Sequence, residues 1–271
     1  MRILFVGDIM GRAGREALET WLPKLKNDLK IDVAIVNGEN AAHGRGITEK
    51  FCKQFYDWGT DVITTGNHIW DQREIIAYIR RDPKLLRPAN FPEGTPGNGY
   101  YLHEISEGRK ILVVNMMARL FMDPMDDPFA KMESILGEYR MGQNCHAIFV
   151  DFHGEATSEK LCFGHHFSGR ISGIIGTHTH VPTADAHVIA GGTAYMSDAG
   201  MSGDYDSVIG VRKDMAIGRF TKKMPGEPFI PASENKMLCG AVIVTDDNTG
   251  KALSIAPLRT GDVLSETMPQ I

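Results

Sequence analysis

Five short apolar segments of this 271-residue chain each run directly into polar side chains of the kinds that bind metals. The segments are residues 3–6, 33–36, 62–65, 147–150 and 171–175. Their continuous apolar character and their length are typical of strands that are buried on both faces of a parallel sheet. Because parallel strands need crossover connections, this feature restricts the chain to an α/β fold.

The segments between these strands support that expectation. Apolar residues at helical spacing predict a first helix over residues 14–28. Thr48 is the expected N-cap of a second helix that ends near Gly59, and residues 72–80 predict a short third helix. Further helices are predicted over residues 129–139, 158–167 and 208–219.

The last third of the chain contains predicted strands with few helices between them. These strands are residues 186–189, 193–196, 237–245 and 252–257. We expect them to add a second sheet packed on the first, with helices outside both sheets. The predicted fold is therefore α/β, a single domain over residues 1–271 built as a two-sheet αββα sandwich.

Composition and charge restrict the partners of the chain. The formal net charge is -5, so the chain lacks the basic field that holds long nucleic acid. No apolar run reaches the roughly 18 residues that span a bilayer, and Gly7 and Asp8 interrupt the first apolar stretch too early for a signal peptide. The four cysteines show no C-x-x-C spacing and are typical of reduced thiols. We therefore expect a cytoplasmic protein with neither a membrane nor a long nucleic acid as partner.

The polar side chains that follow the strands form a candidate metal site. We expect them to converge at one rim of a sheet, because the loops after parallel strands meet there. Carboxylate, amide and imidazole ligands together suit transition metals, and a pair of such ions suits hydrolysis. The candidate ligands are Asp8, Glu39, Asn40, Asn67, His153, His178 and His180.

Several of these residues also have an interpretation without a metal. Asp8 could cap a helix, and His153 could be a hydrogen-bonded core histidine. Glu39 is harder to explain, because a carboxylate after a buried strand is costly unless it is paired or binds a cation. His178 and His180 lie two residues apart and would point to the same side of an extended segment. Their joint occurrence after five strands favours the metal interpretation.

Other polar residues are candidates for contact with a substrate. His68 directly follows Asn67, which could itself form an Asx-turn, and an imidazole suits proton transfer near neutral pH. His43 and Arg45 lie in a glycine-containing loop, where Arg45 could bind a phosphate or could simply be solvated. Residues 198–206 are also rich in glycine and could either wall the substrate site or form structural turns.

The order of these motifs resembles the calcineurin-like metallophosphoesterase superfamily, and more closely its YmdB-like branch. The resemblance rests on residues 7–11 (GDIMG), 37–42 (NGENAA), 66–71 (GNHIWD) and 176–183 (GTHTHVPT), and it extends over essentially the whole chain. Several motifs in a fixed order are far more specific than any one of them.

The chain departs from the wider superfamily at three positions. Met10 stands where most members have His, and Glu39 with Asn40 stands where most have Asp. Ile69 directly follows the Gly-Asn-His motif, where most members have an acid. These departures match the YmdB-like branch, and they imply that Asn40 replaces a lost nitrogen ligand.

The resemblance implies a fold of the metallophosphoesterase type with a binuclear metal centre. One metal would be bound by Asp8, Glu39, Asn40 and His180, and the other by Glu39, Asn67, His153 and His178. Glu39 would bridge the two ions, His68 would act as general acid, and Asp71 is expected to orient His68. The expected cofactors are two divalent or trivalent transition-metal ions, iron or manganese, with zinc as an alternative.

The activity implied by the resemblance is hydrolysis of small cyclic nucleotides, with 2',3'-cyclic AMP as the expected substrate. A hydroxide between the metals would attack the phosphorus in line, and His68 would protonate the departing alkoxide. Two alternatives are left open: a phosphomonoesterase or RNase with the same metal centre, and a metal-binding regulatory protein with incidental catalysis. The expected partner is a small phosphodiester, and a homo-oligomer is also left open.

Overall fold

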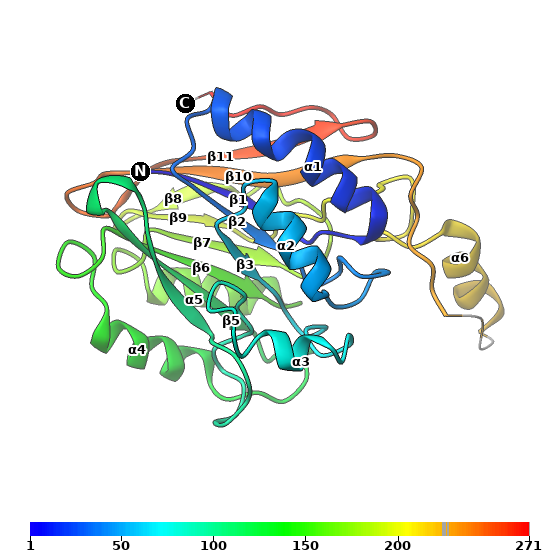
Figure 1. Ribbon diagram of the computed structural model, residues 1–271, viewed down its shortest axis with the longest axis horizontal. Coiled ribbons are helices and arrows are strands. Elements are labelled where there is room, and N and C mark those ends of the chain that lie inside the picture. The colour runs from blue at the N-terminus through cyan, green and yellow to red at the C-terminus, as the bar shows by residue number, and fades with distance from the viewer. Residues whose placement is uncertain (224–225, 227, 271) are drawn as a thin grey trace.

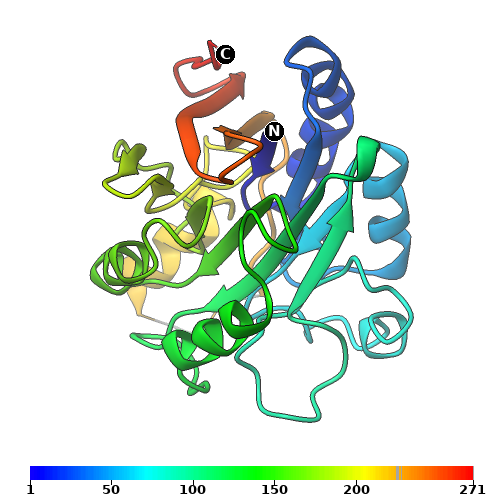
Figure 2. The ribbon, with the colours of Figure 1, turned by 90° about the vertical axis from the view of Figure 1, so that its left-hand side faces the viewer.

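The computed structural model describes residues 1–223, 226 and 228–270, and two β-sheets packed face to face form its centre. Helices α1 (Gly11–Asp28) and α2 (Glu49–Asp57) cover the outer face of one sheet (Figure 1). Helices α4 (Pro128–Glu138) and α5 (Thr157–His166) cover the outer face of the other (Figure 2). This arrangement confirms the predicted two-sheet αββα sandwich, while the extent of the domain over residues 1–271 stays a prediction.

The first sheet has the strand order β11-β10-β1-β2-β3. Its strands are β1 (Arg2–Val6), β2 (Val33–Asn37), β3 (Val62–Thr64), β10 (Met237–Thr245) and β11 (Ala252–Gly261). Strands β1, β2 and β3 run parallel, whereas β10 pairs antiparallel with both β1 and β11. The first strand of the chain is therefore an interior strand of its sheet.

The second sheet has the strand order β4-β5-β6-β7-β9-β8. Its strands are β4 (Tyr100–Glu104), β5 (Lys110–Met117), β6 (Ala147–His153), β7 (Gly173–Thr177), β8 (His187–Ile189) and β9 (Thr193–Met196). Strands β5, β6, β7 and β9 run parallel, and β4 and β8 are antiparallel edge strands.

The expectation that the late strands form the second sheet by themselves is wrong. Strands β8 and β9 extend the second sheet, whereas β10 and β11 complete the first. Strand β10 is apolar on both faces: Leu238 and Val242 belong to the core under α1 and α2, and Ala241 and Ile243 to the core between the sheets. A strand that buries both faces fits an interior position, which β10 takes between β1 and β11.

Strand β1 shows how the two cores divide the same strand. Leu4 and Val6 belong to the core under α1 and α2, whereas Ile3 and Phe5 belong to the core between the sheets. Successive side chains of a strand point to opposite faces, so burial of both faces requires a continuous apolar run. The Phe5 ring lies 5.1 Å from the ring of Phe149 across the sandwich.

The helices begin and end close to their predicted limits, with two exceptions. Thr48 is the N-cap of α2, because its side chain accepts a hydrogen bond from the Phe51 backbone N–H at 3.4 Å. The third predicted helix shrinks to α3 (Ile75–Tyr78), and a short 3-10 turn, η1 (Ser106–Gly108), precedes β5. The last helix, α6 (Lys213–Lys222), begins later than the predicted residue 208.

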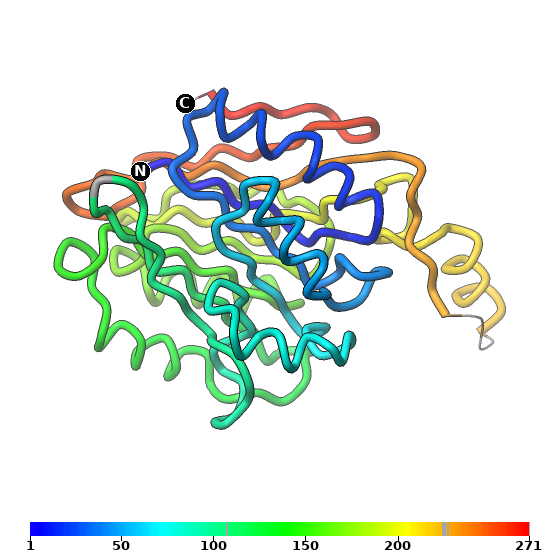
Figure 3. The backbone as a smooth tube through the Cα atoms, viewed as in Figure 1, coloured from blue at the N-terminus to red at the C-terminus, as the bar shows by residue number. Residues whose placement is uncertain are grey.

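The carboxyl ends of the parallel strands of both sheets meet at one end of the sandwich, and α6 projects beyond them (Figure 3). The expectation of a single sheet rim is wrong, because β1, β2 and β3 belong to one sheet and β6 and β7 to the other. The candidate ligands therefore gather where two sheets adjoin. Among the helices of the described residues, none is both long and apolar enough to cross a membrane.

Candidate metal centre

Asp8 lies two residues after the end of β1 and is fully buried. Its Oδ2 accepts a hydrogen bond from the His178 backbone N–H at 3.0 Å, which links the ends of the two sheets. Its Oδ1 is buried and has no hydrogen-bond partner in the described structure. A buried carboxylate oxygen without a donor is costly, so Asp8 fits a position that a cation completes.

Glu39 follows β2 and lies at the centre of the cluster. Its Oε1 lies 3.3 Å from His153 Nε2, and its Oε2 accepts a hydrogen bond from the His68 backbone N–H at 3.3 Å. The Asn37 side chain accepts a hydrogen bond from the Glu39 N–H at 3.1 Å, which fixes the turn after the strand. Glu39 is 1% exposed, and among the described residues no basic side chain compensates it directly apart from imidazoles.

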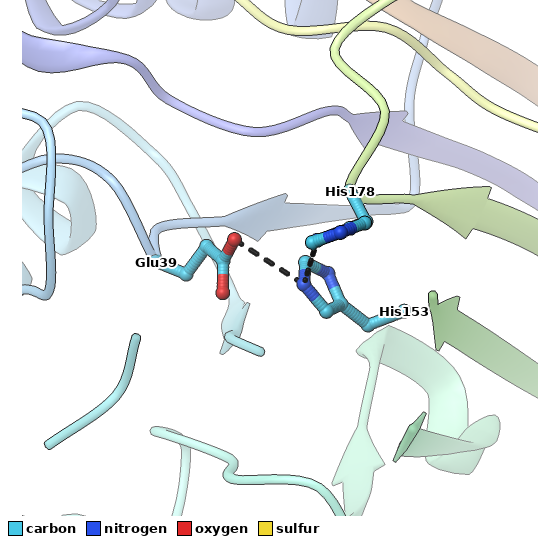
Figure 4. Close-up of side chains that lie close together, drawn as sticks. All are labelled: Glu39, His153 and His178. Atoms are coloured by element: carbon cyan, nitrogen blue, oxygen red, sulfur yellow. Dashed lines mark hydrogen bonds and ion pairs between the residues drawn. The ribbon is translucent and has the colours of Figure 1, made fainter. Parts of the chain in front are cut away.

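Two groups of side chains could each hold a metal ion, and they share Glu39. One is Glu39, His153 and His178, and the other is Asp8, Glu39 and His180, with ligand atoms within 4.8 Å of one another in each group. Figure 4 shows Glu39, His153 and His178 pointing toward one another, with His178 Nδ1 3.2 Å from His153 Nε2. The structure thus brings together the carboxylates and imidazoles expected from the sequence.

The two candidate amides lie beside these groups in different orientations. Asn67 Oδ1 lies 2.9 Å from His153 Nε2, so its oxygen already faces the first group. Asn40 instead turns its amide nitrogen toward Glu39 Oε1, at 3.2 Å, and toward His180 Nε2, at 3.1 Å. Only an amide oxygen binds a metal, so a ligand role for Asn40 requires that its amide group be turned over relative to this orientation.

The expectation that His178 and His180 lie in an extended segment is wrong. Strand β7 ends at Thr177, and the two histidines have φ values of +103° and +67°. Such left-handed conformations are strained for residues other than glycine and persist where the surroundings hold them. The turn places His178 with His153 and places His180 with Asp8, so the two imidazoles serve different groups.

Burial dominates the electrostatics of the site. Burial raises the pKa of Asp8 to about 8, with a further contribution from Asp198. Burial and then the Asp8 charge raise the pKa of Glu39. Burial and neighbouring imidazoles lower the pKa of His153, and they lower that of His178 to about 4. Bound cations would lower the pKa of both carboxyl groups again, and the neutral imidazoles could serve as their ligands.

His68 lies beside the cluster without joining either group. Its Nδ1 lies 3.0 Å from Asp71 Oδ2, which matches the expected orienting contact. Burial lowers the pKa of His68, and Asp71 acts in the opposite direction. Arg45 extends this contact, since its Nη1 lies 4.0 Å from the same Asp71 oxygen.

A cavity of about 1080 Å³ adjoins the cluster. Glu39, His68 and His178 line it on one side, together with His43 and Arg45. Segment 198–206 does not line it. The backbone groups of Ser202 bond to Asp8 O and Met10 N instead, both at 2.8 Å, which supports the structural-turn alternative for that segment.

Two parts of the site were not predicted from the sequence. Helix α6 and the segments beside it supply a further cavity wall, which includes Phe220 and Phe229. A buried relay also runs from His153 Nδ1 to Thr177 Oγ1, at 2.9 Å, and on to Asp151 Oδ1, at 2.7 Å. A signal for the relay was present in the sequence, because Asp151 is an acid inside a buried strand.

The chain is similar to several known proteins in sequence and in structure. The sequence model of the family described as YmdB-like protein matches residues 4–258. A 2',3'-cyclic-nucleotide 2'-phosphodiesterase of Bacillus subtilis (strain 168) is 45% identical over 262 residues, covering 97% of this chain and 98% of that protein. A crystal structure of a hypothetical protein from Thermus thermophilus has a TM-score of 0.90 and 37% identity, covering 97% of this chain and 100% of the other. A novel phosphatase from Mycoplasma pneumoniae has a TM-score of 0.89 and 32% identity, covering 99% and 95%.

Proposed function

Since this chain belongs to the YmdB-like family, we propose that it hydrolyses small cyclic nucleotides, with 2',3'-cyclic AMP as substrate, at a centre of two metal ions. The fold is of the metallophosphoesterase type, and the chain is an enzyme of the phosphodiesterase class. The substrate, the pair of ions and the role of His68 are the proposed part. The name of the Bacillus relative contains this substrate class, and the site geometry supports the pair of ions and the role of His68.

The observation that carries the proposal is the position of Glu39 in both donor groups. A carboxylate has two oxygens and can bind two ions at once. Gly66 leaves the space that such an arrangement needs, because a Cβ atom there would overlap with Glu39 Oε2 and with His153 Nε2. The residues present therefore fit two cations that share one carboxylate.

We assign the ligands as the resemblance implied. One ion would be held by Asp8, Glu39, Asn40 and His180, and the other by Glu39, Asn67, His153 and His178. Mixed oxygen and nitrogen donors without thiolates suit iron or manganese, and they also accept zinc. When bound, such ions polarise the phosphoryl oxygens and make water a better nucleophile.

The remaining steps belong to side chains of the chain itself. Asp71 holds the Nδ1–H of His68, so that the other ring nitrogen can carry the proton that the leaving oxygen receives. Arg45 and His43 line the same cavity, which supports a role for them in binding phosphate oxygens or the sugar. An unactivated ribose alkoxide leaves poorly without a proton, so His68 matters most for natural diesters.

The partners follow from the same proposal. We propose a small phosphodiester as substrate. We predict no long nucleic acid as partner, given a net charge of -5, and no membrane, given the lack of a long apolar run. The cytoplasmic location and a homo-oligomeric state stay predictions. The name of the Mycoplasma structure keeps a phosphatase activity as the second candidate.

The test is to measure the hydrolysis of 2',3'-cyclic AMP and the metal content of the same purified protein. Glu39→Gln removes the shared carboxylate with little change in volume, and Glu133→Gln on the surface of α4 is the matched control. We expect about two ions per chain and turnover, both lost in Glu39→Gln and both kept in Glu133→Gln. If the protein binds two ions but hydrolyses only phosphomonoesters, it is a phosphatase and not a diesterase. If it binds a single ion, the binuclear centre is refuted.

A further inference from the structure

The cavity beside the metal groups has a second wall of a different chemical kind. Helix α6 and the segments beside it supply apolar and aromatic side chains to this wall, although α6 projects away from the sandwich (Figures 1 and 3). The residues that matter here are Ile209, Ala216, Arg219, Phe220 and Phe229. One continuous cavity of about 1080 Å³ thus joins the ionic cluster to an apolar surface.

The apolar side chains of this wall are exposed. Phe220 is 80% exposed, Ile209 is 55% exposed and Phe229 is 37% exposed, whereas Ala216 is the buried residue of α6. Large apolar side chains that gather at the mouth of a cavity indicate a binding surface more often than a folding core. They are available to cover an apolar part of a ligand.

The wall also contains a stacked pair of planar groups. The Arg219 guanidinium carbon lies 3.8 Å from the centre of the Phe229 ring, which is a close cation–π contact. Guanidinium planes and aromatic rings are the surfaces on which proteins stack nucleobases, and such stacking tolerates all the bases. The next residue along α6, Phe220, also lines the cavity and adds a second aromatic ring to this wall.

We propose that this wall binds the nucleobase of the substrate, with Phe220 and the Arg219–Phe229 pair as its stacking surface, while the phosphate lies at the metal groups that share Glu39. The inference rests on the proposed function and adds a specificity-determining residue, Phe220. A phosphodiester group alone would leave most of the cavity unfilled, and small-ligand sites bury most of the ligand surface. The base is the part of a cyclic nucleotide that is planar and uncharged, and it matches this wall.

The test compares two substrates that differ only in the base. These are 2',3'-cyclic AMP and 1-O-methylribose 2',3'-cyclic phosphate, which carries the same cyclic diester without a base. Loss of base–aromatic stacking corresponds to about a 5- to 150-fold loss in binding. Phe220→Ala should therefore raise the KM for 2',3'-cyclic AMP at least about fivefold more than the KM for the baseless ester, and Phe220→Tyr should restore it.

The matched control is Ile217→Ala, because Ile217 lies on α6, is 54% exposed and does not line the cavity. Its kinetics should equal those of the native protein. An equal change in both KM values, or no change in either, would overturn the assignment. A shift of Phe220→Ala to a smaller oligomer in sedimentation, without a selective KM change, would overturn it in favour of a contact with another copy of the chain.

Binding of adenosine, measured by calorimetry, separates this inference from the proposed function. Adenosine has the base and the ribose but no phosphate, so its affinity does not depend on binding of a phosphate at the metal groups. We expect binding that weakens about 5- to 150-fold in Phe220→Ala and is unchanged in Ile217→Ala. Such binding without turnover of either ester would refute the proposed activity and keep the base site. No adenosine binding by the native protein would refute the base site itself.

Discussion

Replacing Asp151 by Asn should weaken metal binding through the protonation state of His153. Asp151 is fully buried at the end of β6 and touches neither donor group. Its Oδ1 accepts a hydrogen bond from Thr177 Oγ1 at 2.7 Å, and Thr177 Oγ1 lies 2.9 Å from His153 Nδ1. Thr177 has one hydroxyl hydrogen, and it donates that hydrogen to the Asp151 carboxylate. The threonine oxygen must then accept from His153 Nδ1–H, which leaves the lone pair on Nε2 for a metal.

The substitution reverses this relay because the other carboxylate oxygen has fixed partners. Asp151 Oδ2 accepts from Thr64 Oγ1 at 2.5 Å and from Asn37 Nδ2 at 2.8 Å. The Asn37 amide nitrogen is only a donor, so the oxygen of an Asn side chain has to stay on that side. Its NH2 group then faces Thr177, which must accept from it and donate to His153 Nδ1. The proton of His153 moves to Nε2, the nitrogen that faces Glu39.

The expected loss in metal affinity of Asp151→Asn follows from one hydrogen bond. A metal can bind Nε2 in the variant only if the proton returns to Nδ1, which leaves one buried donor unpaired. An unpaired buried donor costs about 1–3 kcal/mol, or about 5- to 150-fold in affinity. Loss of the hydrogen-bond partner of a metal-bound histidine typically costs about 10- to 100-fold in metal affinity, which falls within this range.

Affinity is best measured by competition with a coloured chelator at about pH 8. Burial raises the pKa of Asp151 to about 7, so at that pH the native relay holds the carboxylate form. Asp82→Asn is the matched control, because Asp82 is also a buried acid but accepts from Tyr56 and Lys84, away from the site. Native affinity for both ions in Asp151→Asn would refute the tautomer argument. A similar loss in Asp82→Asn would assign the effect to general destabilisation.

Three further outcomes test other parts of the argument. His68→Ala should slow 2',3'-cyclic AMP hydrolysis about 10²- to 10⁴-fold and nitrophenyl esters much less, and equal losses would remove His68 as the acid. Gly66→Ala should keep native circular dichroism but lose bound metal, because its Cβ would overlap with Glu39 Oε2; native metal content would contradict the site. Hydrogen bonds from Arg170 lower the pKa of Glu133 to about 2 from an ordinary 4.5, so the pair stabilises the fold above pH 4.5 and that stability is lost toward pH 2. Glu133→Gln should lower the unfolding free energy by at most about 1 kcal/mol at pH 7 and should leave it unchanged near pH 2. If the urea midpoints of the native protein and the variant differ equally at both pH values, the Glu133–Arg170 pair is not the source of the lost stability.

The sequence by itself predicted the local elements and the chemistry of the cluster. Strand β1 is recognisable because burial of both faces requires the continuous apolar run from Ile3 to Val6. Thr48 is recognisable because a cap needs a side-chain acceptor. Asp8 and Glu39 stand out because charged groups seldom follow buried strands without a partner. These signals are local: a few consecutive residues carry the whole physical reason.

Only the tertiary structure decided how the elements pair and what surrounds the cluster. Strand β10 joins β1, and not the strands that precede it, because contacts between residues far apart in the chain select its neighbour. Turns whose conformation the surroundings impose likewise assign His178 and His180 to different donor groups. The cavity wall that includes Phe220 also depends on the tertiary structure. Hydrogen bonds between side chains of β6 and β7, which are separated by a helix in the chain, determine which nitrogen of His153 carries the proton. Such long-range constraints leave no pattern in neighbouring residues, whereas the apolar runs and the acids that follow them do.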